Sequence, residues 1–229
     1  MSSNVIDEPT FRDKQFVFKD RVHAGQLLAT KLKNHVDRVN VQLLAIPAGG
    51  IPVGHTIAKN LDLPLDVIIV RKIQIPWNTE AGFGAVSYNG TVLLNESLVA
   101  QLGLTSEIVQ WCISQTQQII RERLEKFRGN KPFPDLKKKI VILVDDGLAS
   151  GSTMLVAVKS VQKQTPEKIV VAVPTASTGA IELVAPSVNT LICLNIRSCP
   201  IFAVADAYQK WYDLSDEEVI EILRKSGQS

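Results

Sequence analysis

The sequence predicts an α/β fold, in which helices flank an open parallel sheet. Two observations support this fold class. Short apolar runs typical of buried strands alternate along the chain with longer segments of helical periodicity. An Asn-Gly pair at 89–90 joins two further strand-like runs, which adds an antiparallel hairpin. The 229 residues suffice for one large domain, or for a domain with a small cap.

The first half of the chain supplies two helix and strand pairs and the hairpin. Gly49-Gly50 ends the first apolar run, and Pro52 then suits the first turn of a helix. The run at 65–70 is continuous and apolar, as expected of a buried strand. The predicted elements are a helix at 19–34, a strand at 41–47, a helix at 51–61, a strand at 65–70, and a hairpin of 84–88 with 91–95.

The second half begins with a long helix, which Thr105 or Ser106 caps and which runs to about residue 127. The basic residues at its end suit the negative pole of the helix dipole, so we expect a solvated face of Arg121, Arg123, Lys126 and Arg128. A capping box at Ser215-Asp216-Glu217-Glu218 starts a closing helix. Between them we predict a loop at 131–135, strands at 140–144, 168–173 and 190–194, and helices at 152–162 and 178–184.

Composition excludes several classes of protein. The chain is 45% hydrophobic and 21% charged, and its net charge of +2 gives no reason to expect nucleic acid as a partner. Its three cysteines and three histidines are scattered, which argues against a structural zinc site and for reduced thiols. No stretch approaches the roughly 20 apolar residues of a membrane helix, and the start of the chain is polar. We therefore expect a cytoplasmic protein that binds no membrane.

The run Ile140-Val141-Ile142-Leu143-Val144-Asp145-Asp146-Gly147-Leu148-Ala149-Ser150-Gly151-Ser152-Thr153-Met154 carries the main functional signal. It reads as a buried strand that ends in two acids, followed by a small-residue loop and a helix start. A helix start offers unpaired amides and a partial positive charge to a phosphate. Acids at the carboxyl end of the strand suit sugar hydroxyls, so the pattern fits a phosphorylated sugar. Neither a G-x-x-x-x-G-K-[ST] nor a G-x-G-x-x-G motif is present.

This run resembles the phosphoribosyl diphosphate (PRPP) signature of the type I phosphoribosyltransferases. The resemblance extends to 46–53, Val70-Arg71-Lys72, Glu80 with Gly84-Ala85-Val86, and Tyr212 with 215–219, over about nine-tenths of the chain. These motifs resemble a branch of the superfamily whose acceptor is unassigned. The resemblance implies a Rossmann-like core at about 36–196, with a small hood from about 1–35 and 197–229, in a single domain at 1–229.

The resemblance also implies roles for the loops. Asp145 and Asp146 would hold the ribose hydroxyls and contribute to a Mg²⁺ site, with Lys72 as a further catalytic cation. The 5′-phosphate would bind Gly147, Leu148, Ala149, Ser150, Gly151, Ser152 and Thr153. The diphosphate would bind Ala48, Gly49, Gly50, Arg71 and Lys72. The branch usually has arginine where this chain has Ala48, so a cation is absent from the diphosphate side.

The remaining loops leave alternatives open. Residues 73–83 resemble a flexible lid, in which Glu80 would bind metal-held water or only backbone. Phe202, Tyr208 and Trp211 would either stack on an acceptor base or pack the hood. The implied activity is Mg²⁺-dependent transfer of ribose 5-phosphate from PRPP to a nitrogen acceptor, a nucleobase, by an enzyme that is often a homodimer. The alternative is a PRPP-binding sensor that is weakly active or inactive.

Overall fold

The computed structural model describes residues 3–35, 39–129, 131–199 and 201–227. Its main sheet has six parallel strands in the order β1-β9-β8-β7-β2-β3. The chain runs outward from the centre in both directions, from β2 to β3 and from β7 through β8 to β9. The adjacent strands β2 and β7 therefore form the switch point, where open α/β sheets bind ligands. The strands are β1 (Val5–Asp7), β2 (Val41–Ala45), β3 (Leu65–Val67), β7 (Ile140–Val144), β8 (Lys168–Ser177) and β9 (Thr190–Arg197).

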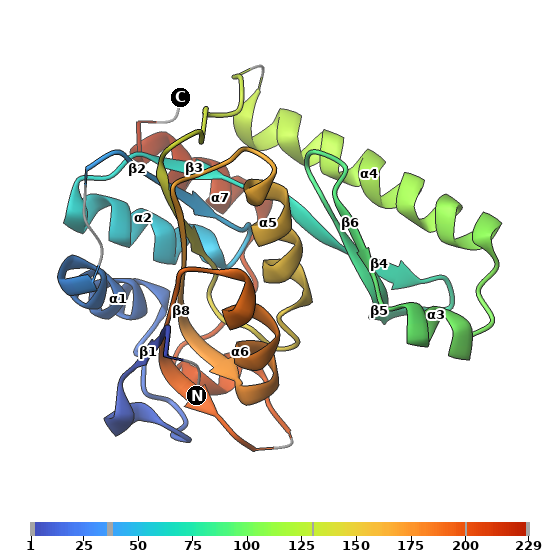
Figure 1. The fold of residues 1–229 in the computed structure, drawn as a ribbon. Helices are drawn as coiled ribbons and strands as arrows, with labels where there is room; N and C mark the ends of the chain where they lie inside the picture. Colours follow the sequence, from blue (N-terminus) through green and yellow to red (C-terminus); the bar gives the residue numbers. More distant parts are fainter. Residues whose placement is uncertain (1–2, 36–38, 130, 200, 228–229) are drawn as a thin grey trace.

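Helices cover both faces of this sheet (Figure 1). Alternate residues of β7 face opposite sides: Ile140, Ile142 and Val144 belong to one apolar core, and Val141 and Leu143 to the other. The first core includes α1 (Arg21–His35), α2 (Gly50–Leu61) and α7 (Asp216–Lys225), and the second includes α5 (Ser152–Gln162) and α6 (Thr178–Val184). Short 3₁₀ turns occur at η1 (Pro9–Phe11), η2 (Ala185–Ser187) and η3 (Val204–Ala207).

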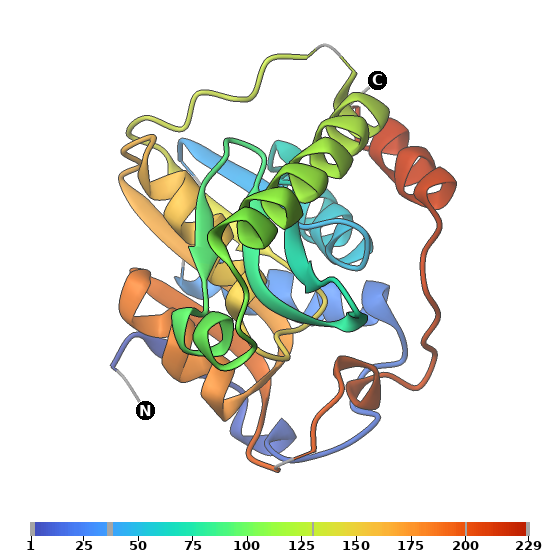
Figure 2. The same ribbon diagram turned by 90° about the vertical axis from the view of Figure 1, so that its right-hand side faces the viewer.

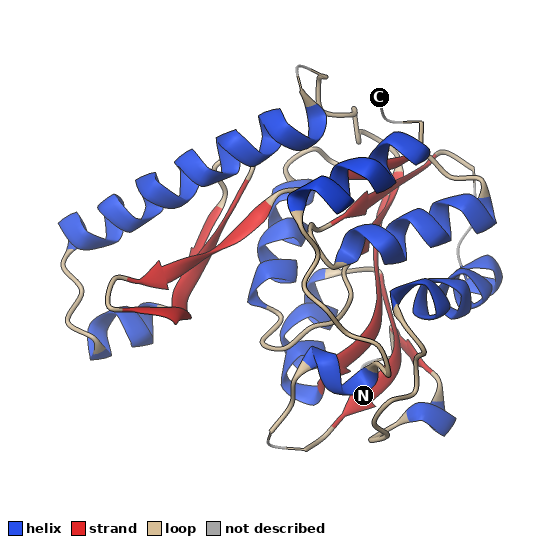
Figure 3. Cartoon of the chain, turned by 180° about the vertical axis from the view of Figure 1, so that it is seen from behind, coloured by secondary structure: helices blue, strands red, loops and turns tan. Residues whose placement is uncertain are grey.

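A second sheet is antiparallel and consists of β4 (Val70–Ile75), β5 (Asn78–Ser87) and β6 (Val92–Leu94). Together with α3 (Glu96–Gln101) and α4 (Ser106–Arg128) it forms an arm that projects from the main sheet (Figure 3). Helix α4 crosses the outer face of the small sheet in Figure 2, and α5 contacts β4, β5 and β6. A buried ion pair from Arg128 to Asp66 fixes the end of α4 on β3.

The predicted fold class is confirmed, and most predicted elements occur within a few residues of their expected bounds. The structure corrects three predictions. The run at 65–70 is not one strand, because β3 ends at Val67 and Val70 begins a strand of the other sheet. Residues 73–83 are not an open loop, because β4 and β5 pair there as a hairpin. Arg128 is not solvated, because its side chain is only 7% exposed and bonds both oxygens of Asp66.

Several features of the fold were not expected from the sequence. Strand β1 and helix α3 were not predicted, and β8 and β9 are longer than their apolar runs. Strand β1 and helix α1 fall in the predicted hood, yet they lie in or against the main sheet. Within the described ranges, no helix is both long and apolar enough to cross a membrane.

Candidate functional site

Two adjacent acids lie at the carboxyl end of β7, at the centre of the main sheet. The backbone N–H of Asp146 donates to Asp145 Oδ1 over 2.8 Å. Burial raises the pKa of Asp145 well above its usual range, and the neighbouring charge of Asp146 raises it further. Burial also raises the pKa of Asp146, although the nearby Arg21 guanidinium opposes that shift. A buried pair of this kind binds hydroxyl groups or a cation more favourably than it binds an anion.

The glycine turn after β2 packs directly on this acid pair. A Cβ atom on Gly49 would lie 1.8 Å from Asp146 Oδ2, and one on Gly50 would lie 2.8 Å from the carbonyl oxygen of Val144. Only glycine permits so close an approach between the two strand ends. Ala48 is partly buried against the core that contains α1 and α2. The turn therefore borders the acids, but residues 46–50 bring no charged side chain to them.

The loop at 147–153 continues from the acids to the start of α5. Leu148 is buried and pairs with β8: its N–H donates to the carbonyl of Thr175 over 2.9 Å, and its carbonyl accepts from the N–H of Ser177 over 3.1 Å. Its amide is therefore engaged by the sheet. Gly151 has a φ of 77° and precedes the first helical turn. The N–H of Ser152 donates to the Ser150 hydroxyl over 3.4 Å, and the first-turn amides of residues 153 and 154 have no intrahelical partner, so they can act as donors to an anion.

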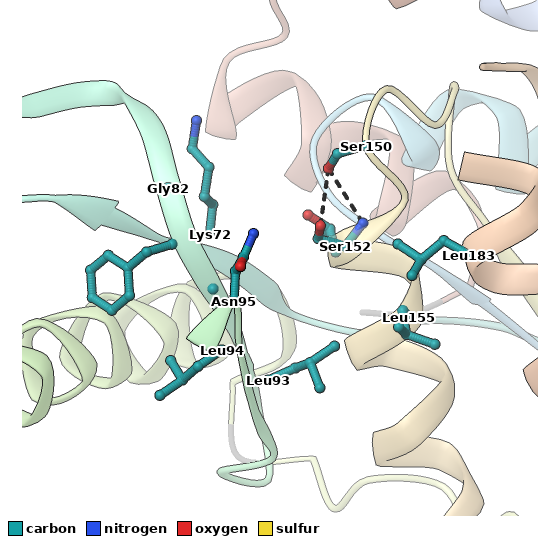
Figure 4. A pocket seen from close by; sticks show the side chains of 12 residues that line it. Lys72, Gly82, Leu93, Leu94, Asn95, Ser150, Ser152, Leu155 and Leu183 are labelled. Atoms are coloured by element: carbon teal, nitrogen blue, oxygen red, sulfur yellow. Dashed lines mark hydrogen bonds between the residues drawn. The ribbon is translucent and has the colours of Figure 1, made fainter. Parts of the chain in front are cut away.

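A pocket of about 310 Å³ separates this loop from the small sheet (Figure 4). Lys72 and Gly82 lie on one side, and Ser150 and Ser152 lie across from them. The stem of Lys72 runs over Gly82, where a Cβ would be 2.2 Å from Lys72 Cγ. The fold thus brings Lys72 to the same cavity as the hydroxyl-rich helix start. The other lining residues are Phe83, Gly84, Leu93, Leu94, Asn95, Thr153, Leu155 and Leu183.

Other residues singled out in the sequence lie elsewhere. Arg71 lines a separate pocket of about 160 Å³ between β4 and α4. Burial lowers the pKa of Arg71, and the charge of Arg123 lowers it further. Phe202 is partly exposed, 5.9 Å from the guanidinium carbon of Arg197. The side chain of Glu80 lies outside the described residues.

Two of the three aromatic residues considered for the acceptor are part of the support behind the acids. Tyr208 is 1% exposed and donates its hydroxyl to the backbone carbonyl of Asp146 over 2.6 Å. Its ring packs against Phe18 and Trp211. Trp211 in turn lies under the guanidinium of Arg21, 3.9 Å from its ring centre. Tyr208 therefore packs inside the protein, and its ring face is not open to an acceptor base.

Arg21 is a site residue that sequence reasoning missed. It occupies the first turn of α1, where the N–H of His23 donates to the side chain of Asp20 over 2.8 Å in the manner of an N-cap. Its Nε lies 2.9 Å from Asp146 Oδ2. The sequence does contain one signal, since a cation in a first helical turn opposes the helix dipole. No local pattern could have identified its partner, which is 125 residues away.

The donors at the site match a magnesium ion only in part. Among the described residues, no group of three or more histidines, cysteines and acids is placed to hold a metal. Asp145 and Asp146 are adjacent hard oxygen donors, and Mg²⁺ commonly takes one or two carboxylates and completes its shell with substrate oxygens and water. The pair therefore fits an ion that arrives with a phosphorylated substrate.

The acid pair, the glycine turn and the hydroxyl-rich helix start thus lie together at the switch point of an α/β sheet. The family model for the phosphoribosyl transferase domain matches residues 20–197. The chain belongs to that family, a family of transferases.

Relatives agree with this assignment. Two sequences from strains of Mycobacterium tuberculosis, which carry the provisional name phosphoribosyl transferase, are 32% identical over 211 residues. These cover 92% of this chain but 47% of each relative, so the chain spans about half the length of the curated relatives it matches. The crystal structure of TT1426 from Thermus thermophilus is 32% identical with a TM-score of 0.74, covering 91% of this chain and 98% of that one. A hypothetical protein from Neisseria gonorrhoeae with bound ppGpp shares the fold at 17% identity and a TM-score of 0.50, with 93% and 97% coverage.

Proposed function

We propose that this protein transfers ribose 5-phosphate from PRPP to a ring nitrogen of a nucleobase and releases pyrophosphate. The observation that carries the proposal is the convergence of three segments, which belong to two loops, at one switch point. The acid pair follows β7, the glycine turn follows β2 and packs on Asp146, and the hydroxyl-rich loop leads into α5. Each segment suits one part of PRPP: the acid pair suits the hydroxyls, the glycine turn the diphosphate, and the hydroxyl-rich segment the 5′-phosphate.

In the proposed reaction the acceptor nitrogen forms a bond to the anomeric carbon as the bond from that carbon to the diphosphate oxygen breaks, and the proton of the acceptor passes to solvent. The electron pair of the broken bond leaves with pyrophosphate. In the transition state positive charge develops on the sugar, and nearby carboxylates stabilise that charge. Asp145 and Asp146 would also orient the 2′ and 3′ hydroxyls.

The anionic groups of PRPP would bind around the acids. The first-turn amides of α5 and the hydroxyls of Ser150, Ser152 and Thr153 would hold the 5′-phosphate. Gly49, Gly50 and Lys72 would contact the diphosphate, because glycines admit an anion close to backbone amides and the lysine adds a charge. Mg²⁺, held by the acid pair and substrate oxygens, would neutralise charge on the leaving group.

Titration calorimetry with PRPP and Mg²⁺ tests the binding half of the proposal, and release of pyrophosphate across a panel of nucleobases tests the transfer. The Asp145→Asn/Asp146→Asn variant should bind PRPP more weakly than the wild type. Asp66→Asn is the matched control, because Asp66 is a buried acid that pairs with Arg128 where α4 ends against β3, away from the acid pair. Unchanged PRPP affinity in the double variant contradicts the site.

A second candidate function is a PRPP sensor without transferase activity. The observation that favours it is the glycine turn, whose residues 46–50 carry no cation for the leaving group. A sensor would bind PRPP with the affinity of an enzyme and release no pyrophosphate with any base of the panel. A transferase releases pyrophosphate with at least one base.

The acceptor side rests on one exposed candidate. Phe202 is partly exposed in the segment that follows β9, whereas Tyr208 is buried. We propose Phe202 as the stacking residue for the base, since each base presents a π face to an aromatic ring. Phe202→Ala should then raise the KM for the acceptor and leave PRPP affinity unchanged. Cytoplasmic location stays a prediction from the sequence, and a homodimer stays an expectation from the family resemblance.

A further inference from the structure

The carboxylate of Asp146 is held from several directions by the protein itself. Arg21 Nε lies 2.9 Å from its Oδ2, and the Gly49 turn closes over the same oxygen. Its backbone is fixed as well, because the carbonyl accepts from the Tyr208 hydroxyl and the N–H donates to Asp145. The side chains of Arg21 and Asp146 are 7% and 13% exposed. Because the pair is so buried, removal of either partner would leave an uncompensated charge away from water.

Arg21 is in turn held by the C-terminal segment. Its Nη1 donates to the backbone carbonyl of Tyr212 over 2.9 Å, and its guanidinium carbon lies 3.9 Å from the ring centre of Trp211. An arginine that both stacks on an aromatic face and bonds through two nitrogens has little freedom to rotate. Residues 208–212 thus reach the acid pair through Arg21.

The chemistry of the acids explains why this support matters. Asp145 and Asp146 are adjacent in the sequence, and two buried carboxylates so close together repel each other. A carboxylate that rotates away from its partner loses the geometry needed to bond a ribose hydroxyl. Arg21 places a positive charge within ion-pair distance of one of them and so offsets this repulsion. Its Nε bonds Oδ2 of Asp146 and so restricts the rotation of that carboxylate.

We propose that Arg21 is a positioning residue that orients Asp146 for the sugar of PRPP, and that Trp211 is the platform for Arg21. This inference rests on the proposed function. It assigns Trp211 to the ribose side of the site, through Arg21, in place of a contact with the acceptor base.

A double-mutant cycle between Arg21→Gln and Asp146→Asn tests the inference, with the PRPP dissociation constant as the measurement. Arg21→Gln should weaken PRPP binding about tenfold or more in the wild-type background, and less than about twofold when Asp146 is already asparagine. Arg21→Lys keeps the positive charge but lacks the planar guanidinium group with its several N–H donors, so it should recover part of the affinity. Equal losses in both backgrounds would overturn the inference, as would no loss in the wild type.

Arg128→Gln separates positioning from general stability. Arg128 matches Arg21 closely: its pair with Asp66 is 2.8 Å long, the two side chains are 7% and 12% exposed, and its guanidinium lies 5.0 Å from the Phe133 ring centre. Both glutamine variants should lower the thermal midpoint, and only Arg21→Gln should raise the PRPP dissociation constant. Equal effects of the two variants on PRPP binding contradict the inference.

A second cycle does not depend on Asp146 variants. Trp211→Leu should weaken PRPP binding in the wild type, but not when residue 21 is already glutamine. If Trp211→Leu instead raises only the KM for the acceptor, its role as the Arg21 platform is wrong. Failure of the wild type to bind PRPP at all would reject the proposed function itself, whereas normal wild-type binding with additive cycles rejects only the role of Arg21.

Discussion

Removal of one hydroxyl group behind the acid pair should destabilise the protein measurably. The Tyr208 hydroxyl donates to the backbone carbonyl of Asp146 over 2.6 Å, and the side chain is 1% exposed. Tyr208→Phe keeps the ring and its packing but leaves that carbonyl without its donor. An unmet buried acceptor costs about 1–3 kcal/mol. For a chain of this length each kcal/mol lowers the thermal midpoint by about 2–4 °C, so we expect a fall of about 2–12 °C.

The assay is thermal unfolding followed by circular dichroism, with urea unfolding as an independent measure of the free energy. Tyr212→Phe is the control, because Tyr212 is 57% exposed and its hydroxyl should contribute within about 0.5 kcal/mol. PRPP affinity should fall in Tyr208→Phe, since the hydroxyl fixes the backbone of Asp146. This reasoning is refuted if the Tyr208→Phe variant unfolds at the same temperature as the wild type and binds PRPP with the same affinity.

Three further variants test other parts of the structure. Gly49→Ala places a Cβ 1.8 Å from Asp146 Oδ2 and should abolish measurable PRPP binding in calorimetry, whereas Gly179→Ala meets no atom within 4 Å and should bind normally. Burial raises the pKa of Tyr88 to about 12, so the folded state favours its neutral form; that stabilisation is complete below about pH 10 and is lost as the pH rises toward 12. Tyr88→Phe should therefore flatten the fall of the urea midpoint over that interval, and an unchanged slope contradicts the assignment. Ser215→Ala removes the capping box of α7 and should cost about 1 kcal/mol in urea unfolding; no loss means that the cap contributes nothing.

Local signals predicted much of the fold. The structure contains α5 over 152–162 and α6 over 178–184 as expected, and Thr105 and Ser215 cap their helices. The caps of α4, α6 and α7 are side chains that bond backbone groups only a few residues away, so a short window of sequence contains both partners.

Strand pairing was harder to predict than burial. Residues 65–70 are all buried, which the apolar run correctly indicated, yet they contribute to two different sheets. An apolar run reports that side chains avoid water, but it does not identify the strand that pairs with them. The hairpin of β4 and β5 was missed for the same reason, since its polar and small residues resemble a loop until they pair.

The sequence by itself determined the fold class, the strand that ends in Asp145-Asp146, and the helix start that follows, because these depend on contacts between near neighbours in the chain. Only the tertiary structure decided what surrounds the acids. Arg21 and Tyr208 reach Asp146 from 125 and 62 residues away, and Gly49 reaches it from the neighbouring strand. Such contacts depend on how the sheet and its covering helices pack, and no local pattern of residues specifies that packing.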